Sequence, residues 1–197
     1  MQSTAATAAP STAQSQPALL DPYPDLPRPR AGAAGVADHV VARPQRVRPR
    51  VMFVASNGGH LAQLMGLRSW WVERERVWVS FDKPDARSRL EGEEVVWAHW
   101  PTTRNLPNLL RNFVLACGAI RRSRPDIVVS TGAAVALPFF LAARLRRLPT
   151  VYIEVYDRMD TRTMSGRLCK PLATEFLVQW PEQEEIYPGA THVGPLL

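Results

Sequence analysis

Cysteine and lysine are scarce in this 197-residue sequence. The two cysteines, Cys117 and Cys169, lack the spacing of a metal site or a disulfide framework, so a zinc module and a disulfide-stapled secreted domain are excluded and a reducing cytoplasm is expected. Lys83 and Lys170 are the only lysines, and arginine carries the remaining positive charge. This bias fits a GC-rich genome, and it also fits phosphate recognition, because the arginine fork matches phosphate geometry.

Long apolar runs and targeting signals are also missing. The N-terminus has no basic start followed by an apolar core, so we expect no secretory signal. The longest apolar run, residues 133–143, is about half of the roughly 20 residues that a membrane-spanning helix needs, and it contains Pro138. Any membrane contact is therefore expected at the surface.

The sequence lacks the common nucleotide-binding fingerprints. Residues 56–60 have two adjacent glycines, but neither the glycine spacing of a dinucleotide loop nor the lysine of a triphosphate loop. Apart from Asp82, no acid follows the second predicted strand where a ribose would be held. A redox Rossmann enzyme is not expected, and we predict no cofactor and no metal.

The positive charge is uneven along the chain. Residues 1–48 are rich in Ala, Pro, Ser and Thr and are predicted to be a disordered leader, whereas residues 49–197 are predicted to form one domain. The formal net charge is +6, and Arg43, Arg46, Arg48 and Arg50 supply four charges within residues 41–50, directly before the first predicted strand. This segment is either a solvated linker or a patch for anionic lipid. The rest of the chain has no marked basic excess, and no nucleic-acid partner is expected.

After residue 50, strand and helix patterns alternate, which predicts an α/β fold with a doubly wound, Rossmann-like parallel sheet covered on both faces. Residues 83–91 are expected to form a short polar helix or loop. Two apolar helices that end in arginines are expected either to pack in the core or to lie on a bilayer surface. The strands are expected at residues 51–55, 77–81, 95–98, 126–130, 149–154, 175–180 and 191–195, and the two helices at 109–120 and 134–145.

Small and polar residues follow several of these strands, at the edge where open α/β sheets bind ligands. Gly58 and Gly59 allow close approach of a ligand, and the start of the next helix favours an anion. His60 at this loop is either a structural residue or a group that accepts a proton from a hydroxyl or binds a phosphate. Glu154 and Arg158 are either a buried pair that ties down a loop or contacts to a substrate hydroxyl and a phosphate.

Six motifs in order resemble those of the PssD-type subunits of bacterial polysaccharide glycosyltransferases. They are similar to the eukaryotic membrane-recruiting subunit of the transferase that adds the second N-acetylglucosamine to dolichol diphosphate, and to the N-terminal half of MurG. The resemblance covers residues 50–197 and leaves out the leader. The motifs are residues 56–61, 101–105, 130–133, 152–158, 165–168 and 176–181.

The resemblance implies the acceptor-binding, N-terminal half of a GT-B glycosyltransferase. It implies a small partner subunit that binds the UDP-sugar, a polyprenyl-diphosphate-linked glycan as acceptor, and a peripheral location on the cytoplasmic face of the membrane. Two residues are candidate catalytic groups, His60 and Glu154. The candidate substrate-binding residues are Ser56, Asn57, Gly58, Gly59, Arg104, Asn105, Thr131, Gly132, Arg158, Ser165 and Gln179.

Three functions remain open at this point. The first is an inverting glycosyltransferase subunit of capsule or exopolysaccharide biosynthesis, active with its partner. The second is a non-catalytic scaffold that recruits a catalytic partner to the membrane. The third, a self-sufficient hydrolase or epimerase of nucleotide sugars, would require a second domain that 197 residues do not hold.

Overall fold

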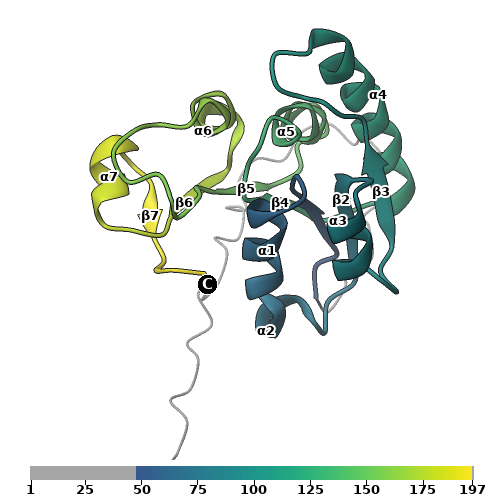
Figure 1. The fold of residues 1–197 in the computed structure, drawn as a ribbon, viewed down its shortest axis with the longest axis horizontal. Coiled ribbons are helices and arrows are strands. Elements are labelled where there is room, and N and C mark those ends of the chain that lie inside the picture. Colours follow the sequence, from purple (N-terminus) through teal and green to yellow (C-terminus); the bar gives the residue numbers. More distant parts are fainter. Residues whose placement is uncertain (1–47, 197) are drawn as a thin grey trace, which may run out of the picture. The chain divides into compact units, whose positions relative to one another are not determined.

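A computed structural model describes residues 48–196, which contain a seven-stranded parallel sheet (Figure 1). The order of the strands is β3-β2-β1-β4-β5-β6-β7, so it reverses between β1 and β4. The predicted leader lies outside the described residues except for its last residue, and the boundary at residue 48 stays a prediction. The strands are β1 (Val51–Val54), β2 (Arg76–Phe81), β3 (Val95–Ala98), β4 (Ile127–Ser130), β5 (Thr150–Ile153), β6 (Glu175–Val178) and β7 (Thr191–His192).

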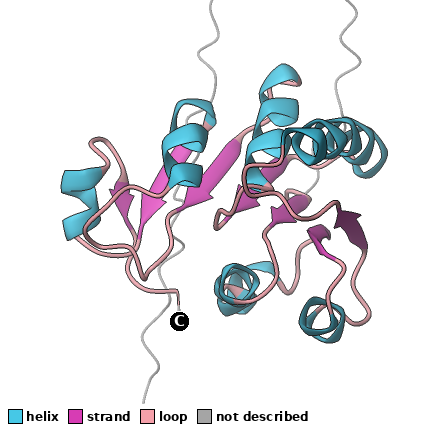
Figure 2. Cartoon of the chain, turned by 45° about the horizontal axis from the view of Figure 1, so that its top comes forward, coloured by secondary structure: helices cyan, strands magenta, loops and turns pink. Residues whose placement is uncertain are grey.

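Helices cover both faces of the sheet, as predicted (Figure 2). Side chains of α4, α5 and α6 pack with one face, and side chains of α1, α2 and α3 pack with the other. The helices are α1 (Gly59–Gly66), α2 (Arg68–Trp71), α3 (Pro84–Arg89), α4 (Leu106–Ser123), α5 (Ala136–Leu145), α6 (Met164–Cys169) and α7 (Glu182–Ile186), with a 3-10 turn η1 (Lys170–Leu172).

Strand β1 is the centre of the sheet because it pairs with both β2 and β4. Its side chains alternate, so Met52 and Val54 enter the core under α4 and α5, whereas Val51 and Phe53 enter the core under α1 and α2. All four residues are fully buried. A strand buried on both faces explains the continuous apolar run of the sequence.

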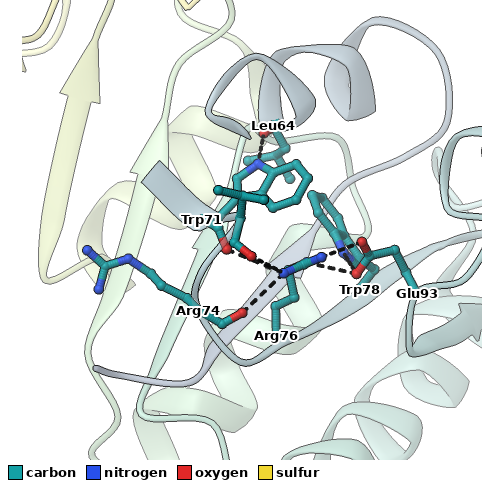
Figure 3. Close-up of polar contacts among 7 residues, drawn as sticks. Leu64, Trp71, Arg74, Arg76, Trp78 and Glu93 are labelled. Atoms are coloured by element: carbon teal, nitrogen blue, oxygen red, sulfur yellow. Dashed lines mark hydrogen bonds and ion pairs between the residues drawn. The ribbon is translucent and has the colours of Figure 1, made fainter. Parts of the chain in front are cut away.

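The core beneath α1 and α2 is aromatic and is closed by one arginine (Figure 3). The ring of Phe53 stacks on Trp78 with the centroids 4.5 Å apart, and Trp71 meets Trp78 edge-on. Arg76 lies over the ring of Trp71 and donates to the carboxylate of Glu93 at 2.8 and 2.6 Å. It also donates to three backbone carbonyls, those of Trp71, Val72 and Arg74. This arginine therefore joins the end of α2 to the segment before β3.

The predicted strands and the two long helices are confirmed, with ends that differ by a few residues. Residues 83–91 contain the short helix α3, and β7 is shorter than predicted. The sequence patterns did not predict α2, α6, η1 or α7. These elements have at most six residues, too few for a helical repeat of apolar residues to show. Both cysteines are free thiols.

Candidate functional site

The glycine loop between β1 and α1 is held by a carboxylate from α3. Asp85 accepts hydrogen bonds from the Gly58 amide at 2.8 Å and from the Asn57 side chain at 3.3 Å. Burial acts to raise the pKa of Asp85, but these hydrogen bonds, together with those from the backbone amides of Ala86 and Asp85 itself, outweigh it and lower the pKa below the usual value. Gly58 has φ 74°, a conformation that glycine adopts without strain. The loop is therefore preformed.

The start of α1 is open in a way that suits an anion. No side chain caps this helix within residues 48–196, so its first-turn N–H groups are available to a ligand. Gly59 is exposed, and a Cβ atom added there would meet nothing within 4 Å. The space beside Gly59 therefore faces away from the protein.

His60 is clasped to the loop after β4 by two reciprocal hydrogen bonds. Its Nδ1 atom lies 2.8 Å from the carbonyl oxygen of Thr131, and the Thr131 hydroxyl donates to the carbonyl oxygen of His60 at 2.7 Å. Because β1 and β4 flank the point where the strand order reverses, this clasp lies where open α/β sheets bind their ligands. The ring is half-buried.

The loop after β4 allows no side chain at its glycine. Gly132 has φ 106°, and a Cβ there would lie 2.6 Å from Tyr152 Oη and 3.5 Å from His60 Cε1. The Ser130 hydroxyl donates to the Val54 carbonyl at 2.6 Å and accepts from the Gly132 amide at 3.0 Å. The predicted residues of the two loops, His60, Thr131 and Gly132, therefore meet in space.

Glu154, at the end of β5, is fully buried rather than open to solvent. Its carboxyl group accepts from the Thr163 hydroxyl at 3.1 and 3.0 Å and from the Val155 amide at 3.0 Å. Burial raises the pKa of this carboxyl, and hydrogen bonds from Tyr187, Val155 and Thr163 oppose the shift. Burial also raises the pKa of the neighbouring Cys169 thiol to about 12. Glu154 anchors the loop that leads into α6.

Arg158 does not pair with Glu154. Its side chain is exposed and forms no hydrogen bond or ion pair among the described residues, while its backbone carbonyl accepts from the Gln183 side chain. The buried pair considered from the sequence is therefore wrong, because Thr163 takes the place of the arginine. The guanidinium of Arg158 is available to an anion.

Gln179 is fully buried, and its amide is engaged inside the protein. Its nitrogen donates to the Gln63 side chain at 2.6 Å and to the Glu154 carbonyl at 2.8 Å, and its oxygen accepts from the Leu196 amide at 2.9 Å. This side chain joins α1, β5 and the segment after β7. A direct contact of Gln179 with substrate stays a prediction.

The other predicted residues lie around the same edge of the sheet. Asn105 caps α4 by accepting from the Asn108 amide at 2.9 Å, and Arg104 precedes it with an exposed side chain. Ser56 donates to the carbonyl of Asn57, and Ser165 is half-buried in α6. No cluster of His, Cys, Asp and Glu within residues 48–196 has the arrangement of a metal site.

Several residues of the site were missed from the sequence. Asp85 had a usable signal, because an acid just after Pro84 at the start of a helix follows the second strand. Gly166 is also required, since a Cβ there would overlap Glu154 Oε2 and lie 2.5 Å from Tyr187 Oη. Nothing in the sequence pattern pointed to Gln63 or Tyr187.

A separate apolar groove of about 560 Å³ lies between α4 and α5. Leu110 and Val114 on α4 are each 65% exposed. The sequence from residue 98 to 153 contains eight arginines and a single acid, Asp126, and one of these arginines, Arg144, lines the groove. In the described part of the chain, no helix is long and apolar enough to cross a bilayer. The groove is lined by Leu106, Leu109, Leu110, Phe113, Pro138, Leu141, Arg144 and Leu145.

Comparison with solved structures identifies the fold as one found in glycosyltransferases and nucleotide-sugar epimerases. MurG of Acinetobacter baumannii superposes with a TM-score of 0.59 at 17% identity, over 73% of this chain and 44% of MurG. UDP-N-acetylglucosamine 2-epimerase of Rickettsia bellii gives 0.60 at 12% identity, over 75% of this chain and 45% of the epimerase. The chain spans less than half the length of either protein, and the predicted fold of one half of a GT-B enzyme is confirmed.

Residues 98–196, half of the sequence, match the family described as oligosaccharide biosynthesis protein Alg14 like. The chain belongs to this family. The human UDP-N-acetylglucosamine transferase subunit ALG14 is 26% identical over 195 residues, covering 80% of this chain and 89% of the human protein. The predicted resemblance to the eukaryotic subunit is confirmed, and the narrower PssD-type assignment stays a prediction.

Proposed function

We propose that this chain is the acceptor-binding subunit of a two-component inverting glycosyltransferase of capsule or exopolysaccharide biosynthesis. The acceptor is a polyprenyl-diphosphate-linked glycan, and the donor is a UDP-sugar held mainly by a small partner subunit. The observation that carries the proposal is His60, clasped at the reversal point of the sheet beside an uncapped helix start, in a member of the Alg14-like family.

In the proposed reaction, an acceptor hydroxyl attacks the anomeric carbon of the donor sugar. The new glycosidic bond forms as the bond to the UDP oxygen breaks, and His60 Nε2 takes the hydroxyl proton. The amides at the start of α1 and the exposed Arg104 and Arg158 bind the diphosphate of the acceptor. Gly59 lets the backbone approach that diphosphate closely. The chain itself needs no cofactor for these steps.

Two observations support a partner. The relatives are described as transferase subunits, and this chain spans under half of the single-chain MurG. In this proposal the donor site lies on the partner subunit. The partner therefore completes the cleft at the carboxyl ends of the strands.

The cytoplasmic face of the membrane is the location that the resemblance implies, and the α4–α5 groove supports peripheral attachment there. Its leucines would enter the acyl region while Arg144 in its lining binds a lipid phosphate. To test this, the charge-inserting variants Leu110→Glu and Leu145→Glu, at two exposed leucines of the groove, are mixed with vesicles rich in anionic lipid. We expect each to bind at least ten-fold more weakly than wild type. Val72→Glu is the control, since Val72 is also exposed but follows α2 on the opposite face of the sheet. Equal binding by all variants would contradict the location.

The alternative function is a scaffold that recruits a catalytic partner and contributes no chemistry. The internal hydrogen bonds of Glu154 and Gln179 favour it, because these two predicted site residues are engaged within the fold. His60 separates the two functions, since a scaffold needs no proton acceptor.

The test is sugar transfer by the complex purified with its co-isolated partner. We expect His60→Ala to lower kcat by two to four orders of magnitude, about the range of general base catalysis, while the complex remains intact. His99→Ala is the matched control, because His99 is exposed and its backbone amide, not its ring, makes the bond to Asn112. Unchanged turnover in the intact His60→Ala complex would establish the scaffold.

A further inference from the structure

We infer that Thr131 is a positioning residue that fixes the tautomer and orientation of His60, so that Nε2 is the ring atom that takes a proton. The inference rests on the proposed function and deepens it, because it assigns a role to a residue that would otherwise be counted as a substrate contact. It is carried by the geometry of the two hydrogen bonds between these residues.

The tautomer follows from the partner of the ring. A backbone carbonyl oxygen can only accept a hydrogen bond, so the 2.8 Å contact between His60 Nδ1 and Thr131 O requires the hydrogen on Nδ1. In the neutral ring, Nε2 then carries a lone pair and no hydrogen. No hydrogen bond to Nε2 exists among residues 48–196, so this lone pair is available to a substrate hydroxyl.

The Thr131 side chain is not available to a substrate. The residue is fully buried, and its hydroxyl donates to the His60 carbonyl at 2.7 Å. That bond fixes the backbone of His60, while the carbonyl of the same threonine fixes its ring. Thr131 therefore fixes both the backbone and the ring of His60.

The carbonyl of Thr131 is itself held in place from both sides. Ser130 before it is tied to β1 through the Val54 carbonyl, and the amide of Gly132 after it is tied back to the Ser130 hydroxyl. Gly132 adopts φ 106° and brings its backbone against Tyr152 and His60, where a side chain would not fit. The acceptor of the Nδ1 hydrogen is thus part of a rigid loop between two core strands.

The first test reads the tautomer directly by nitrogen NMR of the full-length chain at alkaline pH, where imidazoles are neutral. The signals of His60 are assigned by their loss in His60→Gln. We expect the wild-type spectrum to show Nδ1 protonated and Nε2 unprotonated. Thr131→Val keeps the backbone carbonyl that accepts the Nδ1 hydrogen and removes only the hydroxyl that holds the His60 backbone. We therefore expect the same tautomer in this variant, with ring signals shifted or broadened because the ring is less firmly oriented. A wild-type ring protonated on Nε2 overturns the inference.

The second test measures kinetics in the assembled transferase. Thr131→Val is expected to lower kcat about ten-fold, the equivalent of one hydrogen bond, with little change in the KM for the acceptor. Thr131→Ser restores the hydroxyl and is expected to return kcat to within about two-fold of wild type. A rise in KM at constant kcat would make Thr131 a substrate contact instead, and unaltered kinetics would also contradict the role.

The two tests fail in different ways. If the wild-type pair transfers no sugar to any lipid-linked acceptor, the proposed function fails, while the NMR experiment still decides whether Thr131 sets the tautomer. If Thr131→Val does not fold, seen as loss of its thermal transition, Thr131→Ser and Thr131→Ala are compared in both experiments. Ring signals of His60 in Thr131→Ala that match wild type in position and width, or an unchanged kcat, then overturn the inference.

Discussion

The guanidinium of Arg76 forms two hydrogen bonds with the carboxylate of Glu93 while its plane lies over the ring of Trp71. Both partners of the ion pair are about four-fifths buried, with side-chain exposures of 20% and 17%. The pair covers the aromatic core under α1 and α2. Removing one of its partners therefore tests how much the pair stabilises that core.

We expect Arg76→Ala to destabilise the protein by roughly 2–4 kcal/mol, because it removes the cation from the largely buried Glu93 carboxylate, which keeps only the bond from the Trp78 indole N–H, and one donor from each of three carbonyls. Chemical denaturation followed by tryptophan fluorescence measures the change. Glu73→Ala is the control, since Glu73 pairs with Arg48 on the exposed surface, and its midpoint is expected to stay close to wild type. Similar losses in both variants would show that Arg76 has no special role.

Alanine substitutions at two neighbouring glycines before α1 distinguish an effect on folding from an effect on ligand binding. Gly59→Ala meets nothing within 4 Å and needs no positive φ, so we expect it to fold normally and to gain up to about 1 kcal/mol of helix stability. We nevertheless expect transfer to fall at least ten-fold, because the new methyl group occupies the space of the diphosphate. The measurement pairs a thermal melt with the transfer assay.

Gly58→Ala serves as the comparison within the same loop. Its φ of 74° is strained for alanine, so this variant is expected to lose roughly 1–2 kcal/mol of stability. If Gly59→Ala is as active as wild type, the loop does not face the acceptor diphosphate.

The raised pKa of Glu154 predicts that the stability of the protein depends on pH. Its pKa is raised by burial above the ordinary value of 4.5, so the folded chain holds a proton that the unfolded chain releases. The stabilisation is complete below pH 4.5 and is lost as the pH rises through the folded-state pKa. Glu154→Gln keeps a neutral polar group and removes this loss.

Denaturation of wild type and Glu154→Gln is compared from pH 4 upward. We expect the difference in free energy of unfolding to move in favour of the variant as the pH rises, by at most about 1.4 kcal/mol per pH unit. A difference that does not vary with pH would mean that Glu154 titrates alike in both states.

Gly166 is expected to reject any side chain. Gly166→Ala would place a Cβ against Glu154 Oε2 and 2.5 Å from Tyr187 Oη, which costs roughly 1–3 kcal/mol as overpacking. The thermal midpoint measures this loss. Removing the hydroxyl in the double variant Gly166→Ala/Tyr187→Phe is expected to recover part of it, and a fully stable single variant would contradict the packing.

The sheet was predictable because its strands carry their own signal. Val51 to Val54 and Ile127 to Ser130 are short apolar runs that end in small polar loops, and this pattern places both loops at one edge of a parallel sheet. The approach of His60 to Gly132 therefore follows from strand order. The hydrogen bond between Asp85 and the Gly58 amide and the burial of Gln179 could not be predicted in this way, because they depend on the directions of side chains from separate elements.

His60 and Thr131 are 71 positions apart in the chain, and the loops that hold them meet only when β4 lies beside β1. Strands β2 and β3 and the whole of α4 lie between them in the sequence. During synthesis, the ribosome releases a β1–β2–β3 unit long before residue 131 emerges, and this unit has an exposed β1 edge that waits for β4. The nascent chain therefore cannot form the two hydrogen bonds between His60 and Thr131 until four of the seven strands have been synthesised. Until then, the exposed edge of β1 is the surface that a chaperone would have to shield.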